Sequence, residues 1–167
     1  MHRLTSLMLS LVIAVSGVVL VLIVCLFLDG GSTPVAQAVS LTNTPLATTW
    51  YVDGAGDDGD DCLSLGTACQ TVGAAVGKAA DGDTIWIGTG VYTETLWISK
   101  DLTMIGDARE TTILDGNQAD RVIKCTKRLW LQNLTIRNGA KDDIHGGGIQ
   151  ASATAVLTLS HTLVYSN

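Results

Sequence analysis

Residues 82–116 read GDTIWIGTGVYTETLWISKDLTMIGDARETTILDG, and this stretch decides the fold. It contains four short apolar runs, each closed by Gly, Asp or a charged pair: Thr84–Ile87, Leu96–Ile98, Leu102–Ile105 and Thr112–Leu114. Runs this short and this rich in Ile, Thr and Trp are typical of β-strands. They follow one another too closely for crossover helices, which excludes an alternating α/β sheet. The pattern therefore predicts an all-β chain whose strands stack in a coil, as in β-solenoids.

The pattern repeats downstream of this stretch. LQNLTIRNG at 131–139 matches LSHTLVYSN at 159–167 with an offset of 28 residues, so that Leu131 corresponds to Leu159 and Ile136 to Val164. The spacing between the earlier runs is unequal. This combination indicates constant strands joined by turns of variable length.

The N-terminus predicts export. Residues 6–28 form an uncharged run of 23 residues after Arg3, long enough to span a bilayer at about 1.5 Å per residue. Ala36 and Ala38 then form an A-x-A cleavage pattern. Two interpretations remain open: a cleaved signal peptide or a retained transmembrane anchor helix, within residues 1–38. Both place the remainder outside the cytoplasm, with residues 39–48 as a linker and 49–167 as the folded domain.

The net charge bears on the possible binding partners, and the cysteine content bears on the redox compartment. The net charge is −6 and no stripe of Lys and Arg is present, which argues against nucleic acid. In an oxidising compartment, Cys62 and Cys69 are expected to form a disulfide. A zinc site is the rival interpretation, but no Cys-x-x-Cys pair is present. Cys125 is then left over, and we expect it to be buried in a strand.

One helix is expected after the hydrophobic segment. In TVGAAVGKAA at 71–80, Val72, Ala75, Val76 and Ala79 fall on one face. Asp81-Gly82-Asp83 ends it.

These residues carry a family resemblance. DTIWI at 83–87, GVYTE at 90–94, KDLTMIG at 100–106 and ILDG at 113–116 are similar to the N-terminal coils of secreted bacterial right-handed parallel β-helix proteins of the pectin-lyase-like kind. The resemblance covers residues 49–167. It implies about three coils, with the helix at 71–80 closing the first. Members of that family continue for many coils, so we expect a truncated product or one part of a larger assembly.

The resemblance also suggests catalytic candidates, which the spacing disfavours. Polygalacturonase-like β-helices use paired Asp and a His-Gly from different coils, whereas Asp142, Asp143 and His145 share one turn here. A lyase would need acidic calcium ligands on neighbouring strands. The sequence shows no acidic and basic residues at equivalent positions of neighbouring coils, so no catalytic residue is predicted.

Two binding hypotheses rest on residue type. An acidic loop with flexible glycines suits Ca²⁺, and its carboxylates are those of Asp53, Asp57, Asp58, Asp60 and Asp61. The loop lacks an EF-hand framework, and a solvated turn is the alternative. Three tryptophans, Trp86, Trp97 and Trp130, are candidates for stacking on sugars, because alternation with inward Ile turns Trp86 and Trp97 outward. Packing under loops is the alternative.

The sequence therefore favours an exported β-helix with a non-catalytic surface for polysaccharide or another envelope protein. The alternative is the N-terminal part of a polysaccharide lyase or glycoside hydrolase. No cofactor is expected apart from the calcium considered above.

Overall fold

The computed structural model describes residues 8–15, 18–25, 46–140 and 146–167. The chain divides into two compact units, residues 1–43 and 44–167, which are described separately. In the first unit, β1 (Met8–Val15) pairs antiparallel with β2 (Val18–Cys25), with Met8 opposite Cys25.

The hairpin lies in the segment for which the sequence predicts either a cleaved signal peptide or a retained anchor helix, and both interpretations stay predictions. The segment is rich in Val and Ile, whose β-branched side chains favour strands, and Ser16-Gly17 separates its two halves. Among the described residues, no helix has the length and apolar character needed to cross a membrane. The proposed cleavage residues Ala36 and Ala38 lie outside the described residues.

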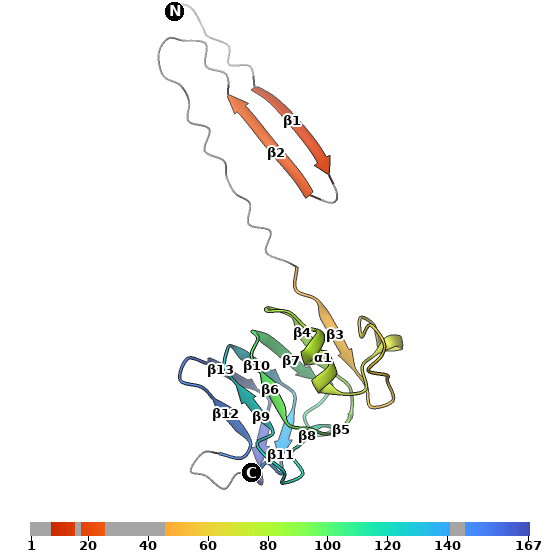
Figure 1. Ribbon diagram of the computed structural model, residues 1–167, viewed down its shortest axis with the longest axis vertical. Helices are drawn as coiled ribbons and strands as arrows, with labels where there is room; N and C mark the ends of the chain where they lie inside the picture. Colours follow the sequence, from red (N-terminus) through yellow and green to blue (C-terminus); the bar gives the residue numbers. More distant parts are fainter. Residues whose placement is uncertain (1–7, 16–17, 26–45, 141–145) are drawn as a thin grey trace, which may run out of the picture. The chain divides into compact units, whose positions relative to one another are not determined.

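The second unit is a parallel β-helix made of three sheets (Figure 1). The five-stranded sheet has the order β13 (Leu157–Ser160), β10 (Leu129–Gln132), β7 (Leu102–Gly106), β4 (Thr84–Ile87) and β3 (Thr49–Val52). The four-stranded sheet has the order β14 (Leu163–Tyr165), β11 (Thr135–Arg137), β8 (Thr112–Asp115) and β5 (Gly90–Thr93). The three-stranded sheet has the order β12 (Ile149–Ala151), β9 (Ile123–Cys125) and β6 (Leu96–Ile98).

Each complete coil contributes one strand to each sheet. The three complete coils are β4–β5–β6, β7–β8–β9 and β10–β11–β12, with β3 before them and β13 and β14 after them. This confirms the expected number of coils. The predicted register is also confirmed, because Leu131 pairs with Leu159 and Ile136 with Val164.

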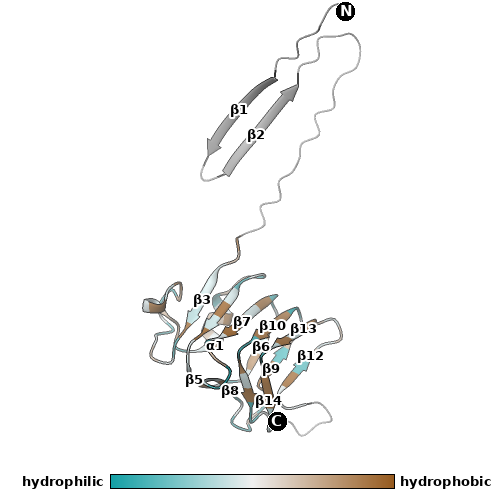
Figure 2. Ribbon diagram, turned by 180° about the vertical axis from the view of Figure 1, so that it is seen from behind, coloured by the Kyte–Doolittle hydropathy of each residue, from teal (hydrophilic) through white to brown (hydrophobic). Residues whose placement is uncertain are grey.

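The core runs along the inside of the coils. In β4, Ile85 and Ile87 are fully buried while Trp86 between them is half-buried. Ile85, Met104 and Leu131 stack on one another through the register of three neighbouring strands and are all fully buried. Burial of each such side chain contributes about 2 kcal/mol. Figure 2 shows the apolar segments recurring from strand to strand.

A short helix covers the start of the coil. Helix α1 (Val72–Lys78) follows a 3₁₀ turn at Leu65–Thr67, and it contacts β3, β4 and β6. The hydroxyl of Thr71 accepts a hydrogen bond from the N–H of Ala74 at 3.1 Å and so caps the helix N-terminus. The apolar face predicted from the sequence is confirmed, because its four members are buried: Val72, Ala75, Val76 and Ala79.

Candidate functional site

The outer face of the five-stranded sheet carries two rows of side chains from successive coils. The parallel register aligns one row of Thr49, Thr84, Thr103, Trp130 and Thr158, and a second of Tyr51, Trp86, Ile105, Gln132 and Ser160. Alternation along each strand sends these side chains away from the core. The outer face of this sheet therefore carries mostly hydroxyl groups and aromatic rings, together with Ile105 and Gln132.

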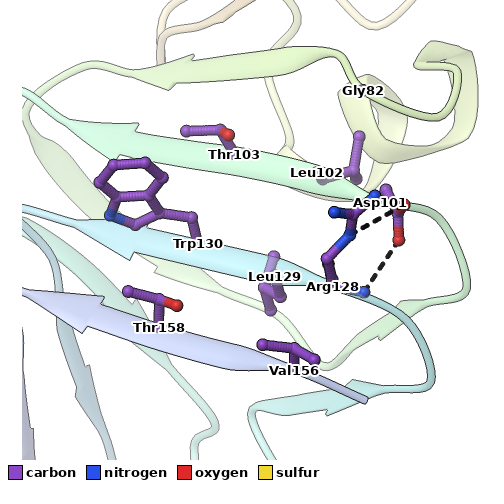
Figure 3. A pocket seen from close by; sticks show the side chains of 9 residues that line it. All are labelled: Gly82, Asp101, Leu102, Thr103, Arg128, Leu129, Trp130, Val156 and Thr158. Atoms are coloured by element: carbon purple, nitrogen blue, oxygen red, sulfur yellow. Dashed lines mark hydrogen bonds and ion pairs between the residues drawn. The ribbon is translucent and has the colours of Figure 1, made fainter. Parts of the chain in front are cut away.

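A shallow groove of about 260 Å³ lies on this face. We call it the Trp130 groove, and its outward lining residues are Asp101, Thr103, Arg128, Trp130, Val156 and Thr158. Figure 3 shows Trp130 between Thr103 and Thr158, which lie on the two neighbouring strands. Trp130 keeps 49% of its surface exposed although it stands mid-strand. The groove therefore offers an open indole face flanked by two hydroxyls.

One end of the groove is closed by the ion pair of Arg128 and Asp101. Asp101 Oδ2 accepts from Arg128 Nη2 at 2.9 Å and from Nε at 3.3 Å, while Oδ1 accepts from the backbone N–H of Arg128 at 2.9 Å (Figure 3). The backbone hydrogen bond and then the guanidinium lower the pKa of Asp101. The pair joins two coils and was not predicted, since its members lie 27 residues apart in the sequence.

The structure distributes the three candidate tryptophans over two sheets. Trp86 lies on the same sheet face as Trp130 and packs against Tyr51, with ring centroids 6.0 Å apart. Trp97 points outward from β6 in the three-stranded sheet, 68% exposed, with Lys124 Nζ 5.0 Å from its ring centroid. The outward orientation expected for Trp97 is confirmed, but Trp97 does not join the other two in one surface.

The carboxylates of the acidic loop bind the loop's own backbone. Asp53 Oδ1 accepts from Ala55 N–H at 2.9 Å, and Asp57 Oδ1 accepts from Gly59 N–H at 2.8 Å. These are turn-stabilising contacts.

Two further carboxylates tie the loop to the elements that follow it. Asp58 accepts from the N–H and hydroxyl of Thr71, and Asp61 accepts from the hydroxyl of Thr67. Lys78 donates to the carbonyls of Asp58 and Asp60. Within the described parts of the chain, no group of three or more ligating side chains gathers that could hold a metal ion. The loop is therefore held in place by its own carboxylates, and calcium binding by them stays a prediction.

The cysteines form the expected disulfide and the expected buried thiol. Cys62 and Cys69 form a disulfide, and both are fully buried beside α1. Cys125 is buried in β9 as a free thiol, and burial raises its pKa. The earlier candidates Asp142, Asp143 and His145 lie outside the described residues.

A row of polar residues on the four-stranded sheet corrects one expectation. Asp115, Arg137 and Tyr165 occupy equivalent positions on three successive coils. Arg137 Nε donates to Asp115 Oδ2 at 2.8 Å, so acidic and basic residues do align on neighbouring coils. This alignment could not be recognised in the sequence, because Asp115 and Arg137 are separated by 22 residues, whereas the repeat found in the sequence has an offset of 28 residues.

Both carboxylate oxygens of Asp115 in this row accept hydrogen bonds from neighbouring groups. Burial alone would raise its pKa, but hydrogen bonds from Asn117 N–H, Arg137 and Asn138 outweigh burial and leave the pKa lowered. Asp115 is therefore an ionised carboxylate whose lone pairs point at fixed donors. It is poorly suited to donate or take up a proton near neutral pH.

No protein-family profile and no curated protein matches the sequence. Solved structures do resemble the fold. Pectin methylesterase PemA from Erwinia chrysanthemi superimposes with a TM-score of 0.53 at 16% identity, covering 73% of this chain and 46% of that one. A pectin methylesterase in complex with hexasaccharide VII gives the same TM-score, identity and coverage. A pectin methylesterase variant in complex with hexasaccharide IV gives 0.52 at 17% identity, covering 72% and 46%.

This chain thus spans less than half the length of these enzymes. At this sequence identity, the superpositions are evidence for a shared fold and not for a shared activity. The parallel strand order, the stacked core and these superpositions agree on one architecture. The chain has the right-handed parallel β-helix fold that the pectin methylesterases also have.

Proposed function

We propose that this chain is an exported β-helix protein whose Trp130 groove binds polysaccharide without catalysing a reaction on it. The observation that carries the proposal is the half-exposed indole of Trp130, standing mid-strand between two Thr side chains on a rigid sheet. Trp130 leaves about half of its surface open to solvent on the outer face, which gives a ligand an apolar surface to pack on. Sugar rings present apolar C–H faces that pack on such a ring, while their hydroxyls bond to neighbouring polar groups.

The length of the face suits an extended chain. Trp86 and Tyr51 lie on the same outer face as Trp130, on the neighbouring row and two to three strands away. Parallel strands are about 4.8 Å apart, so the two indoles lie on the order of 10 Å apart, about two sugar residues. Two of the similar solved structures are complexes with a hexasaccharide, which supports the view that this fold accommodates such ligands.

The disulfide supports export from the cytoplasm. A buried disulfide in a small Gly-rich domain is typical of exported proteins, because the cytosol keeps thiols reduced. The similarity to pectin methylesterases supports the same assignment. The role of residues 1–38 as signal peptide or anchor stays a prediction, as does an envelope protein as partner.

The alternative function is enzymatic, and the row of Asp115, Arg137 and Tyr165 favours it. An active site on this fold is expected to need acidic and basic residues at equivalent positions of neighbouring coils, and this row has them. However, glycoside hydrolysis needs two carboxyl groups about 5–9.5 Å apart, one of them protonated. Asp115 is the row's single carboxylate, and its lowered pKa makes it a weak base. Binding is therefore the better supported function.

The test is a binding titration with matched tryptophan variants. We expect soluble pectin, xylan or glucan to bind residues 46–167 in affinity electrophoresis, and Trp130→Ala to weaken binding at least tenfold. Trp97→Ala removes a more exposed indole from another sheet, and we expect it to change binding less than twofold. Equal losses in both variants, or no binding to any of the three polysaccharides, would refute the proposal. Release of reducing ends, unsaturated ends or methanol by wild type but not by Asp115→Asn would establish the enzymatic alternative.

A further inference from the structure

The charge of the Trp130 groove bears on which polysaccharide it takes. Arg128 is the single cation in the lining, and three hydrogen bonds to Asp101 engage its backbone and its guanidinium. The Arg128 side chain is 73% exposed, whereas that of Asp101 is 29% exposed. The carboxylate is therefore held close to the sheet with the guanidinium on top of it. Together the two groups contribute no net charge to the groove.

The other cations near this end of the groove are engaged in the same way. Lys127, next to Arg128, bonds both carboxylate oxygens of Asp81 at 2.8 and 3.1 Å. Lys100, next to Asp101, turns toward α1 and donates to the carbonyls of Val76, Gly77 and Ala79. Each positive charge beside the groove thus already has a partner in a neighbouring coil or in the cap.

We propose, building on the polysaccharide-binding function above, that the Trp130 groove selects uncharged sugars and discriminates against uronates. Arg128 donates to Asp101 from Nε and Nη2 only, so a uronate carboxylate could reach the remaining guanidinium N–H groups, but it would then share one cation with Asp101 and lie beside a second negative charge. Like charges at contact distance disfavour binding, and the net charge of −6 adds a weaker, salt-screened repulsion. The indole of Trp130 and the hydroxyls of Thr103 and Thr158 require no charge on the ligand.

The experiment compares sugars that differ only in the carboxyl group. The probes are two hexamer pairs: galacturonate hexamer with its carboxyl-reduced form, and cellohexaose with its C6-oxidised form. Calorimetric titration of residues 46–167 at 50 and 300 mM NaCl gives the affinities. For whichever backbone binds, we expect the neutral member to bind at least tenfold more tightly at low salt, with a smaller ratio at high salt.

Asp101→Asn isolates the role of the ion pair. The amide oxygen of Asn can still accept from the Arg128 N–H, so the turn is kept while the guanidinium loses its counter-charge. We expect this variant to bind the uronate at least fivefold more tightly than wild type does, with little change for the neutral sugar. Asp107→Asn makes the same change in net charge at the exposed turn after the other end of β7, and it should leave the uronate affinity within twofold.

The outcomes separate the two proposals. A wild-type protein that binds the uronate as well as or better than its neutral partner overturns the selectivity but leaves polysaccharide binding intact. An equal gain in Asp101→Asn and Asp107→Asn overturns the role of the ion pair. Failure of all four hexamers to bind overturns the polysaccharide-binding function itself. Circular dichroism of each variant, compared with wild type, checks that the fold is kept.

Discussion

Glu94 and Lys100 hold opposite ends of the same helix. The carboxylate of Glu94 accepts hydrogen bonds from the N–H groups of Val72 and Gly73 at 2.9 and 2.7 Å, at the N-terminus of α1. The ammonium of Lys100 donates to carbonyls at the C-terminus. Both residues flank β6 in the first coil, so one coil supplies an anion and a cation where the helix dipole favours each.

This arrangement predicts that the cap depends on the first coil. Lys100→Met removes the donor to three helix carbonyls, and we expect it to lower the free energy of unfolding by about 1–2 kcal/mol. Glu94→Gln keeps one acceptor and should cost about 1 kcal/mol. Urea unfolding measures both. Glu110→Gln, an exposed carboxylate paired with Arg109, is the matched control and should leave the urea midpoint unchanged. A Lys100→Met variant as stable as this control would contradict the arrangement.

The strands and the core were predictable because alternation is a local signal. Ile85 and Ile87 flank Trp86, so one strand length settles which side chains face inward. The cap helix was predictable for the same reason, since its apolar face repeats within seven residues. The register of the last coils was visible because Leu131 and Leu159 lie in segments of similar sequence.

The groove and the polar row were not predictable because they depend on turn lengths. Asp101 meets Arg128 across 27 residues, whereas Asp115 meets Arg137 across 22. Turns of different length separate strands that pair in space, so no fixed offset aligns them. The N-terminal hairpin was not predictable for another reason, because a long apolar run rich in Val and Ile is compatible with a helix or with two strands.

Two buried carboxylates make stability fall at acid pH. Burial alone would raise the pKa of Asp83, but hydrogen bonds from Ala80 N–H, Trp50 Nε1–H and Thr48 N–H outweigh it, and the pKa is lowered from 3.8. The pKa of Asp115 is lowered in the same way. Because the unfolded chain binds protons more readily, the stabilisation is present above the unfolded pKa and is lost as pH falls through 3.8 toward the folded value.

The urea midpoint should therefore be level near pH 6 and fall steadily between pH 5 and pH 3. Asp83→Asn presents an amide to three donors, and we expect it to lose about 2–3 kcal/mol at pH 6. The difference between wild type and this variant should shrink as pH falls, because the Asp83 carboxyl group takes up a proton more readily in the unfolded wild-type chain than in the folded one. A difference that stays constant from pH 6 to pH 3 would rule out Asp83 as a source of the acid sensitivity.

The disulfide stabilises the cap against unfolding. It joins Cys62 and Cys69, seven residues apart, and Lys78 Nζ lies 3.2 Å from Cys62 Sγ. Closing a loop of this size limits the unfolded chain, so the Cys62→Ala/Cys69→Ala double variant should be less stable by about 2.5 kcal/mol. Thermal unfolding with a reductant should bring wild type down to the double variant. The same reductant should leave the unfolding temperature of the double variant unchanged. A lower unfolding temperature of the double variant would show that the reductant does not act through this disulfide.

Because Tyr92 is buried, we expect the protein to lose stability at alkaline pH. It is buried in β5, where its hydroxyl donates to the carbonyl of Gly88 at 3.1 Å. Burial, and then the negative charge of Asp53, raise its pKa from 10.0 to about 12. A raised folded pKa gives stabilisation that is complete below pH 10 and is lost as pH rises toward 12.

Absorbance at 295 nm should therefore show one of the three phenols ionising about two pH units late, together with unfolding. Tyr92→Phe keeps the ring and removes the hydroxyl, so it should lose about 1 kcal/mol at pH 7 from the missing hydrogen bond. The variant should also unfold at a less sharply defined alkaline midpoint, because the buried ionisation is gone. If Tyr92→Phe kept the delayed absorbance step, the late phenol would be Tyr51 or Tyr165, and the assignment to Tyr92 would be wrong.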